Sequence, residues 1–229
     1  MSDTPSLTPT LTQYVARQPI FNAEKAVFAY ELLYRNSANN AFPVGTSDEH
    51  ATSRLFFNTL MLVGAEKLTA HQLAFVNLST DALLDEFPKL LNPEHTVIEI
   101  VERTVNIAAV ASRIKTLKGQ GYIFALDDYD GDEKWEPLLA LVNYIKIEAE
   151  EPIIKTNMRV KKLKRSYPHC KIIVERIETY DQFINLRDAG CDYFQGFFFA
   201  RPEMLTYSGV DPSKVTVFEL LKAIAKESL

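Results

Sequence analysis

The sequence predicts an α/β protein, a modified TIM-type (β/α)8 barrel whose first strand runs antiparallel to its neighbours. Eight short apolar runs alternate with helical patterns along most of the 229 residues, as expected for buried parallel strands joined by helices. The first two runs, 14–21 and 26–35, are separated by only a few residues. Parallel strands need a crossover of about a dozen or more residues, so this pair must be antiparallel. An open doubly wound sheet is the alternative fold.

The other strands follow from apolar runs that end in polar or turn residues. They are expected at 74–79, 96–102, 123–129, 143–148, 172–178 and 192–196. Apolar residues at helical spacing predict helices at 51–68, 79–91, 106–120, 151–166, 179–190 and 215–229. We therefore expect a flexible N-terminus at 1–13, one barrel domain at 14–206, and a C-terminal linker or helix at 207–229. That last segment either ends the chain as an exposed helix or leads into a further domain.

Composition narrows the class of protein. With 47% hydrophobic and 24% charged residues, the chain can bury one large core. A net charge of -5 argues against DNA as a partner, although it leaves room for a small phosphorylated ligand. No apolar run is long enough for a membrane span and the start lacks a secretory signal, so we expect a cytoplasmic protein that does not enter membranes. Cys170 and Cys191 are expected to be free, buried thiols.

Polar residues able to hold a metal or polarise a phosphate stand at the ends of the predicted strands. They are Glu31, Asn77, Glu99, Asp127, Asp128, Lys146, Glu175 and Gln195. Any one of them would ordinarily be read as a solvated turn residue. Since the carboxyl ends of barrel strands meet at one face, a single pocket is the economical explanation of the whole set.

The chemistry of this set suits phosphodiester cleavage. Hard divalent cations prefer oxygen ligands, and two of them a few ångströms apart can activate a water and stabilise a leaving oxygen. Lys146 stands between Ile145 and Ile147, so strand alternation turns it away from them and toward the acidic centre. The alternative is a lysine that reaches solvent or pairs with a single acid.

The order of these motifs resembles the EAL domain family. The motifs are ELLYR at 31–35, FVNLS around Asn77, EIVE at 99–102, LDDY around Asp127, YIKIE around Lys146, VERIET from Glu175 and DYFQGFFFARP around Gln195. Members of that bacterial family are metal-dependent phosphodiesterases that cut cyclic di-GMP to pGpG, or degenerate relatives that only bind. The resemblance runs from Gln18 to Pro202. ARQPIF, AYELLYR and the C-terminal helical pattern resemble the subgroup in which an HDOD domain follows.

The resemblance implies a role for each position. Glu31, Asn77, Glu99 and Asp127 would hold a first Mg²⁺ or Mn²⁺, and Asp127 and Asp128 a second. Lys146, Glu175 and Asp128 would serve catalysis, with Lys146 orienting or deprotonating the attacking water. Gln195 and Glu175 would complete the metal shell directly or through water. Arg35 would grip a phosphate of cyclic di-GMP, Gln18 and Pro202 would contact a guanine, and Glu102 would tether the loop after the aspartate pair.

Three departures from the family pattern bear on whether the site is catalytically active. Active members read D-D-F-G-T-G-Y-S-S after the aspartate strand, whereas this chain reads DDYDGDEKWEPL at 127–138. Arg176 stands where the family has glycine, and Glu148 where it has aspartate. We therefore expect a weak phosphodiesterase, with a catalytically inactive receptor or protein-interaction module as the alternative. The resemblance leaves monomer and homodimer open, because family members often pair through the region near this loop and that region is altered here.

Overall fold

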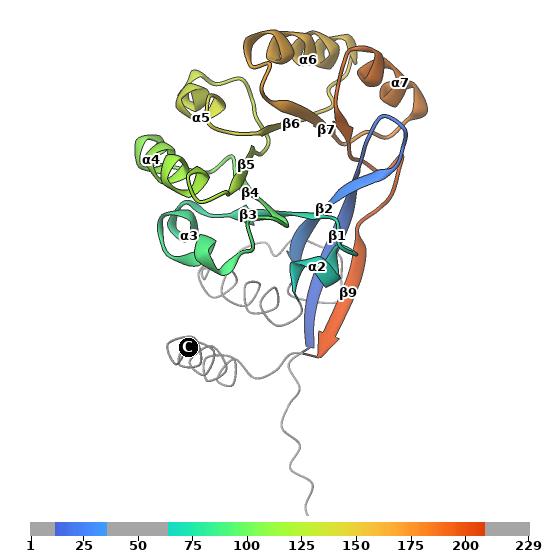
Figure 1. Ribbon diagram of the computed structural model, residues 1–229. Coiled ribbons are helices and arrows are strands. Elements are labelled where there is room, and N and C mark those ends of the chain that lie inside the picture. The colour runs from blue at the N-terminus through green and yellow to red at the C-terminus, as the bar shows by residue number, and fades with distance from the viewer. Residues whose placement is uncertain (1–11, 36–63, 209–229) are drawn as a thin grey trace, which may run out of the picture.

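Nine strands form one sheet in the computed structural model, which describes residues 12–35 and 64–208 (Figure 1). They are β1 (Thr12–Phe21), β2 (Val27–Arg35), β3 (Leu73–Leu78), β4 (Thr96–Ile100), β5 (Ile123–Leu126), β6 (Tyr144–Glu148), β7 (Lys171–Glu175), β8 (Tyr193–Phe194) and β9 (Glu203–Ser208). Strands β2 to β8 pair in chain order and in parallel. β1 then lies between β8 and β2, which closes the barrel. The barrel prediction is confirmed, and the open sheet is excluded.

The antiparallel first strand is confirmed, and its turn explains why the link can be so short. β1 pairs with β2 from Tyr14 opposite Arg35 to Phe21 opposite Val27. Asn22 closes the turn by accepting hydrogen bonds on Oδ1 from Glu24 N and Ala26 N, at 3.1 and 2.8 Å. A side-chain oxygen that binds the backbone two residues on is a recurrent turn device, so this link needs no helix.

β9 was not predicted from the sequence. It pairs antiparallel with β1, from Thr12 opposite Ser208 to Arg17 opposite Glu203, and extends the sheet beyond the closed barrel. Its sequence, EMLTYS, is short and mixed in polarity, and its pairing partner lies almost two hundred residues away in the chain. β1 also begins at Thr12, before the predicted start of the domain.

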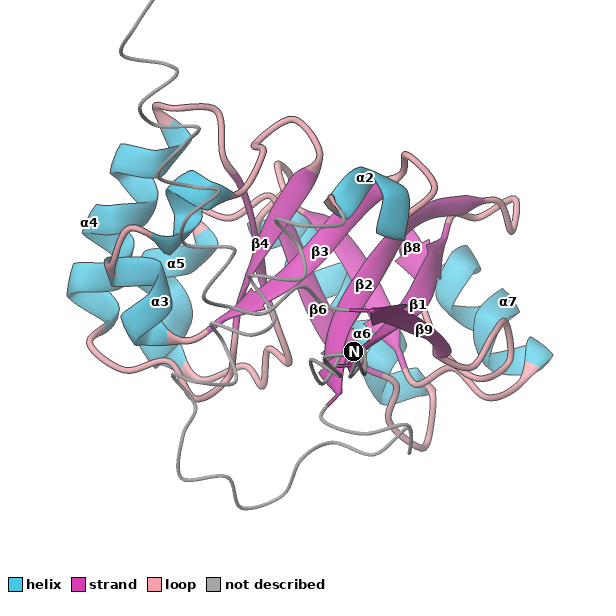
Figure 2. Cartoon of the chain, turned by 90° about the horizontal axis from the view of Figure 1, so that it is seen from below, coloured by secondary structure: helices cyan, strands magenta, loops and turns pink. Residues whose placement is uncertain are grey.

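Helices cover the outside of the strands (Figures 1 and 2). They are α2 (Ala65–Leu68), α3 (Thr80–Leu84), α4 (Ile107–Lys118), α5 (Glu136–Leu139), α6 (Ile154–Ser166) and α7 (Tyr180–Asp188), with 3-10 turns η1 (Phe87–Leu90) and η2 (Glu133–Trp135). Most of the predicted helix at 51–68, and all of that at 215–229, lie outside the described residues. No helix within 12–35 and 64–208 has the length and apolar character that a membrane crossing requires.

One helix prediction needed correction, and two short helical segments were not predicted. The segment 79–91 is not one helix but α3 followed by η1, with Pro88 in the first turn of η1, where its missing N–H does no harm. η2 and α5 were not predicted, because a few residues give too short a pattern to read as helical. α7 begins at a capping box formed by Thr179 and Gln182, and the cap predicted at Gly190 has φ 94°.

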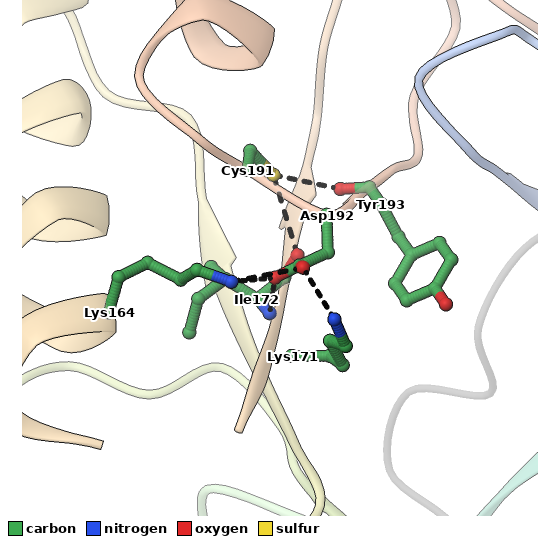
Figure 3. Close-up of polar contacts among 6 residues, drawn as sticks. All are labelled: Lys164, Lys171, Ile172, Cys191, Asp192 and Tyr193. Atoms are coloured by element: carbon green, nitrogen blue, oxygen red, sulfur yellow. Dashed lines mark hydrogen bonds and ion pairs between the residues drawn. The ribbon is translucent and has the colours of Figure 1, made fainter. Parts of the chain in front are cut away.

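Asp192 ties the start of β8 to its surroundings (Figure 3). Its carboxylate accepts hydrogen bonds from the Ile172 backbone N–H at 2.8 Å, from Lys164 Nζ at 2.8 Å and from Lys171 Nζ at 3.2 Å. The neighbouring Cys191 is buried with its sulfur against the Ile172 and Tyr193 carbonyl oxygens. Cys170 is also buried, and both thiols are free, as predicted.

Candidate active site

The candidate site residues lie one layer above a hydrophobic plug inside the barrel. The plug consists of Ile20, Ala29, Phe75, Val97, Ala125 and Ile173, with Tyr144 and Tyr193 packed against it. Two residues further along the respective strands stand Glu31, Asn77, Glu99, Asp127, Lys146, Glu175 and Gln195. Strand side chains repeat every second residue on one face, so these polar side chains point into the barrel axis above the plug. Five of these residues lie within β2, β3, β4, β6 and β7, and Asp127 and Gln195 directly follow β5 and β8.

Lys146 is at the centre of this layer. Its Nζ lies 2.6 Å from Glu99 Oε1, 2.8 Å from Asp127 Oδ1, 2.9 Å from Glu175 Oε1 and 3.5 Å from Glu31 Oε1. The Lys146 side chain has no exposed surface. The structure therefore brings the lysine and four carboxylates together, as the strand pattern of the sequence indicates.

Two amides hold Glu31 in place. Gln195 Nε2 donates to Glu31 Oε2 at 2.8 Å, and Asn77 Nδ2 donates to Glu31 Oε1 at 3.2 Å. The other oxygens of these amides, and Glu99 Oε2, are buried without a hydrogen-bond donor. A buried acceptor without a partner costs about 1–3 kcal/mol, so a donor or a cation placed against these oxygens would be stabilised.

Gln195 owes its position to the glycine that follows it. Gly196 has φ 155°, and a Cβ at this position would stand 2.2 Å from the Ile177 carbonyl oxygen. The backbones of the two segments touch here, and Ile177 N donates to Gln195 O at 3.1 Å. Only glycine permits this approach, which directs the Gln195 side chain toward Glu31.

Charge is out of balance in the layer. If all four carboxylates were ionised, one ammonium would face four negative charges. Burial raises the pKa of Glu99 well above its usual range and that of Glu175 to about 8. Burial alone would lower the pKa of Lys146, but the surrounding carboxylates, Asp127 first, outweigh it and raise the pKa. The lysine is therefore charged, and some of its acidic neighbours retain protons unless further positive charge is supplied.

Asp128 lies at the rim of the layer. Its backbone has φ 44°, in the left-handed region, and the residue is half-buried. Burial first, and then the adjacent Asp127 carboxylate, raise the pKa of Asp128 to about 6. Carboxylate oxygens of Glu102, Asp127 and Asp128 lie within 4.8 Å of one another, close enough to surround one cation.

The loop after the aspartate pair folds on itself. Asp130 Oδ1 accepts from Asp132 N at 2.9 Å and from Trp135 Nε1 at 3.1 Å. Trp135 is 1% exposed and belongs to the main hydrophobic core. The segment that replaces the family's glycine-containing loop is thus a folded turn that leads through η2 into α5.

The residues predicted to bind substrate surround the same end of the barrel. Gln18 on β1 pairs across the sheet with Glu31, and its Nε2 donates to Ala200 O at 3.4 Å. Pro202 is half-buried just before β9. Arg35 is the last residue of β2, and its side chain lies outside the described part of the chain.

An ion pair between Arg176 and Glu148 was not predicted, although both positions were singled out as departures. Arg176 Nη2 lies 2.5 Å from Glu148 Oε1, and the Arg176 backbone has φ 56°. The two residues lie at the adjoining ends of β6 and β7, where Glu148 is registered with Glu175. The signal available in the sequence was that both residues stand at the ends of neighbouring predicted strands, where side chains of opposite charge can meet.

Comparison with known proteins agrees with this architecture. No protein-family model matches the sequence. The cyclic di-GMP phosphodiesterase CdgJ of Vibrio cholerae is 32% identical over 216 residues, covering 94% of this chain and 50% of CdgJ. The uncharacterized protein YuxH of Bacillus subtilis is 33% identical over 222 residues, covering 93% of this chain and 53% of YuxH. The chain thus spans about half the length of the curated relatives that it matches.

Solved structures share the fold. An EAL domain protein from Listeria monocytogenes superposes with a TM-score of 0.68 at 20% identity, over 83% of this chain and 88% of that one. The fold of this chain is that of the EAL domain. A standalone EAL protein from Vibrio cholerae, solved with c-di-GMP bound, superposes with a TM-score of 0.67 at 20% identity, over 89% of this chain and 95% of that one.

Proposed function

We propose that this EAL domain hydrolyses cyclic di-GMP to pGpG with the help of divalent metal ions. The observation that carries the proposal is the buried layer in which one lysine faces four carboxylates and several buried oxygens have no donor. The excess of acceptors and of negative charge suits hard cations and a phosphorylated ligand held through them. The name of the relative CdgJ agrees with this substrate.

The residues of the layer fit a divalent cation. Glu31, Asn77, Glu99 and Asp127 would hold the first Mg²⁺ or Mn²⁺, and Asp127 with Asp128 would contribute to the second. Asn77 Oδ1 and Glu99 Oε2 support this assignment, since both are buried acceptors without a donor. A bound cation would supply Lewis acidity at the phosphate and lower the pKa of its water.

Lys146 would orient rather than deprotonate the attacking water in the site as it stands. The surrounding carboxylates raise its pKa, so the amine remains an ammonium at neutral pH. An ammonium donates hydrogen bonds and cannot accept a proton. Burial raises the pKa of Glu175 to about 8 in the metal-free site, and Glu175 would serve catalysis beside Lys146.

The substrate would enter from the rim. Gln18 on β1 and Pro202 just before β9 would contact a guanine. Arg35 at the end of β2 would bind a phosphate oxygen, and Gln195 would complete the ligand shell of the metal. A dianionic ligand approaching an acidic layer would be repelled, so cation binding would be needed for substrate binding as well as for turnover.

A silent receptor is the second candidate function. The folded loop around Trp135 and the Arg176–Glu148 ion pair favour it, because both replace glycine-containing elements of active family members. Three expectations from the sequence stay predictions. They are a C-terminal HDOD domain, a homodimer near the aspartate loop and a cytoplasmic location. The half-length coverage of both curated relatives is compatible with a further domain.

The test is incubation of purified protein with cyclic di-GMP and Mn²⁺ or Mg²⁺, with pGpG followed by chromatography. Calorimetric titration of the nucleotide with Ca²⁺ present measures binding separately. We expect metal-dependent pGpG that is lost in Glu31→Ala and kept in Glu24→Ala, an exposed carboxylate in the β1–β2 turn. Binding without turnover would favour the receptor over the enzyme. Absence of both binding and turnover would exclude both functions.

A further inference from the structure

We propose that the exposed side of α6 is a docking surface for membranes that carry anionic phospholipids. The surface consists of two apolar and four basic side chains, which we call the α6 stripe. They are Ile154, Lys155, Met158, Lys161, Lys162 and Arg165. The contact would be made at the surface of the bilayer, by residues outside the site proposed above for cyclic di-GMP, so it does not depend on catalysis there.

Helical spacing places the six side chains on one side of α6. Each lies three or four positions from another member of the stripe, and all six are exposed. The buried residues of the helix lie on its opposite side and are Thr156, Asn157, Val160 and Leu163. Figure 1 shows α6 on the outside of the strands. The stripe therefore faces away from the barrel.

The four cations of the stripe are not neutralised by neighbouring acids. α6 contains no acidic residue, and its two other basic side chains are already paired. Arg159 Nη1 lies 3.0 Å from Glu150 Oε1, and Lys164 Nζ lies 2.8 Å from Asp192 Oδ2. Within residues 12–35 and 64–208, no carboxylate forms an ion pair with a cation of the stripe. The stripe thus concentrates positive charge on a chain whose net charge is -5.

The two apolar side chains distinguish between the possible anionic partners. Ile154 is 56% exposed and Met158 is 67% exposed, and they lie one helical turn apart. A nucleic acid backbone would use the cations but not the apolar pair, and lysine is depleted from interfaces between proteins. A bilayer with anionic phospholipids uses both. Its phosphates attract the cations, and the apolar side chains reach the boundary between headgroups and acyl chains.

The experiment measures co-sedimentation of the protein with vesicles of phosphatidylcholine, either alone or mixed equally with phosphatidylglycerol. A charge variant carries Lys155→Gln, Lys161→Gln, Lys162→Gln and Arg165→Gln, and an apolar variant carries Ile154→Ser and Met158→Ser. The matched control changes the net charge equally, by glutamine substitution of exposed lysines on α2, η1, α4 and η2. These are Lys67, Lys89, Lys115 and Lys134. Circular dichroism verifies that each variant is folded.

We expect the wild type to bind the mixed vesicles and not those of phosphatidylcholine alone, with an affinity that falls as NaCl is added. The control should retain this binding. The charge variant should bind at least about tenfold more weakly, and the apolar variant should also bind more weakly. Formation of pGpG should be the same in all variants, because none of the substituted residues belongs to the polar layer.

Several results would overturn the proposal and leave the proposed function standing. They are no vesicle binding by the wild type, equal binding to the two kinds of vesicle, wild-type affinity in the charge or the apolar variant, and equal loss in the charge variant and the control. Wild-type binding to single-stranded DNA or to polyglutamate, without binding to vesicles, would replace the membrane by a nucleic acid or an acidic protein.

Discussion

Lys146 Nζ lies 2.6 Å from Glu99 Oε1, and neither side chain has any exposed surface. A buried ion pair of this kind is costly to form, and losing one partner leaves the other charge uncompensated. Here three further carboxylates depend on the same ammonium. The pair therefore links the stability of the barrel interior to the charge of the site.

Lys146→Met should unfold more easily in metal-free buffer, by about 3–5 kcal/mol in the free energy of unfolding, because four buried carboxylates lose their common cation. Mn²⁺ should recover more stability in this variant than in the wild type, since the ion replaces the missing charge. Urea denaturation with EDTA or Mn²⁺ measures both effects. Lys162→Met, at an exposed position of α6, is the control, and equal loss in both variants would contradict the prediction.

The metal-free protein should become less stable as pH rises between about 5 and 8. Burial raises the pKa of Glu175 from its ordinary value of 4.5 to about 8, so over this range the unfolded chain has lost a proton that the folded chain retains. The folded state then binds more protons than the unfolded state, and the free energy of unfolding falls with increasing pH. Denaturation in EDTA at several pH values across this range tests the sign of the change in the free energy of unfolding with pH. Glu175→Gln should flatten the slope, and an unchanged slope in that variant would assign the effect elsewhere.

Mn²⁺ affinity should increase over the same range, because the ion binds ionised carboxylates and displaces their protons. The raised pKa values of Asp128, about 6, and Glu175, about 8, set the window. Calorimetry in two buffers of different ionisation enthalpy gives the number of protons released. Proton release at pH 6 that does not exceed that at pH 9 would contradict this assignment.

Arg176→Gly should leave stability unchanged or raise it by up to about 1 kcal/mol. Arg176 has φ 56°, which costs an L-residue about 1–2 kcal/mol and a glycine nothing, whereas its exposed ion pair with Glu148 contributes little. Because glycine is also the family's residue there, we expect faster pGpG formation. Arg176→Ala keeps the unfavourable φ and removes only the guanidinium, so it separates the two causes. A gain in turnover shared by both variants would assign the effect to charge.

Asp192→Asn should destabilise the protein by about 1–3 kcal/mol, since the Ile172 N–H and two lysines lose a charged acceptor in a largely buried setting. Thermal unfolding measures the loss. Asp188→Asn removes a carboxylate that is 62% exposed and should change stability little. Activity per folded molecule should be the same in both, because Asp192 lies outside the polar layer.

How far the sequence could predict the structure depended on the range of the interactions involved. The antiparallel β1–β2 pair followed from a link too short for a crossover, and the inward polar layer followed from apolar runs that end in polar residues. β9 could not be predicted, because it is held by pairing with β1 from the opposite end of the described chain. η2 and α5 were missed because their apolar residues are too few to show a period.

The sequence by itself determined which residues face the barrel axis, since alternation along each strand is a local property of the backbone. Only the tertiary structure decided how they meet. Barrel closure and strand register place Lys146 within reach of four carboxylates, and the turn after β4 brings Glu102 to the aspartate pair. Distances between strands are set by the shape of the whole barrel, and the charge balance of the site depends on those distances through Coulomb's law.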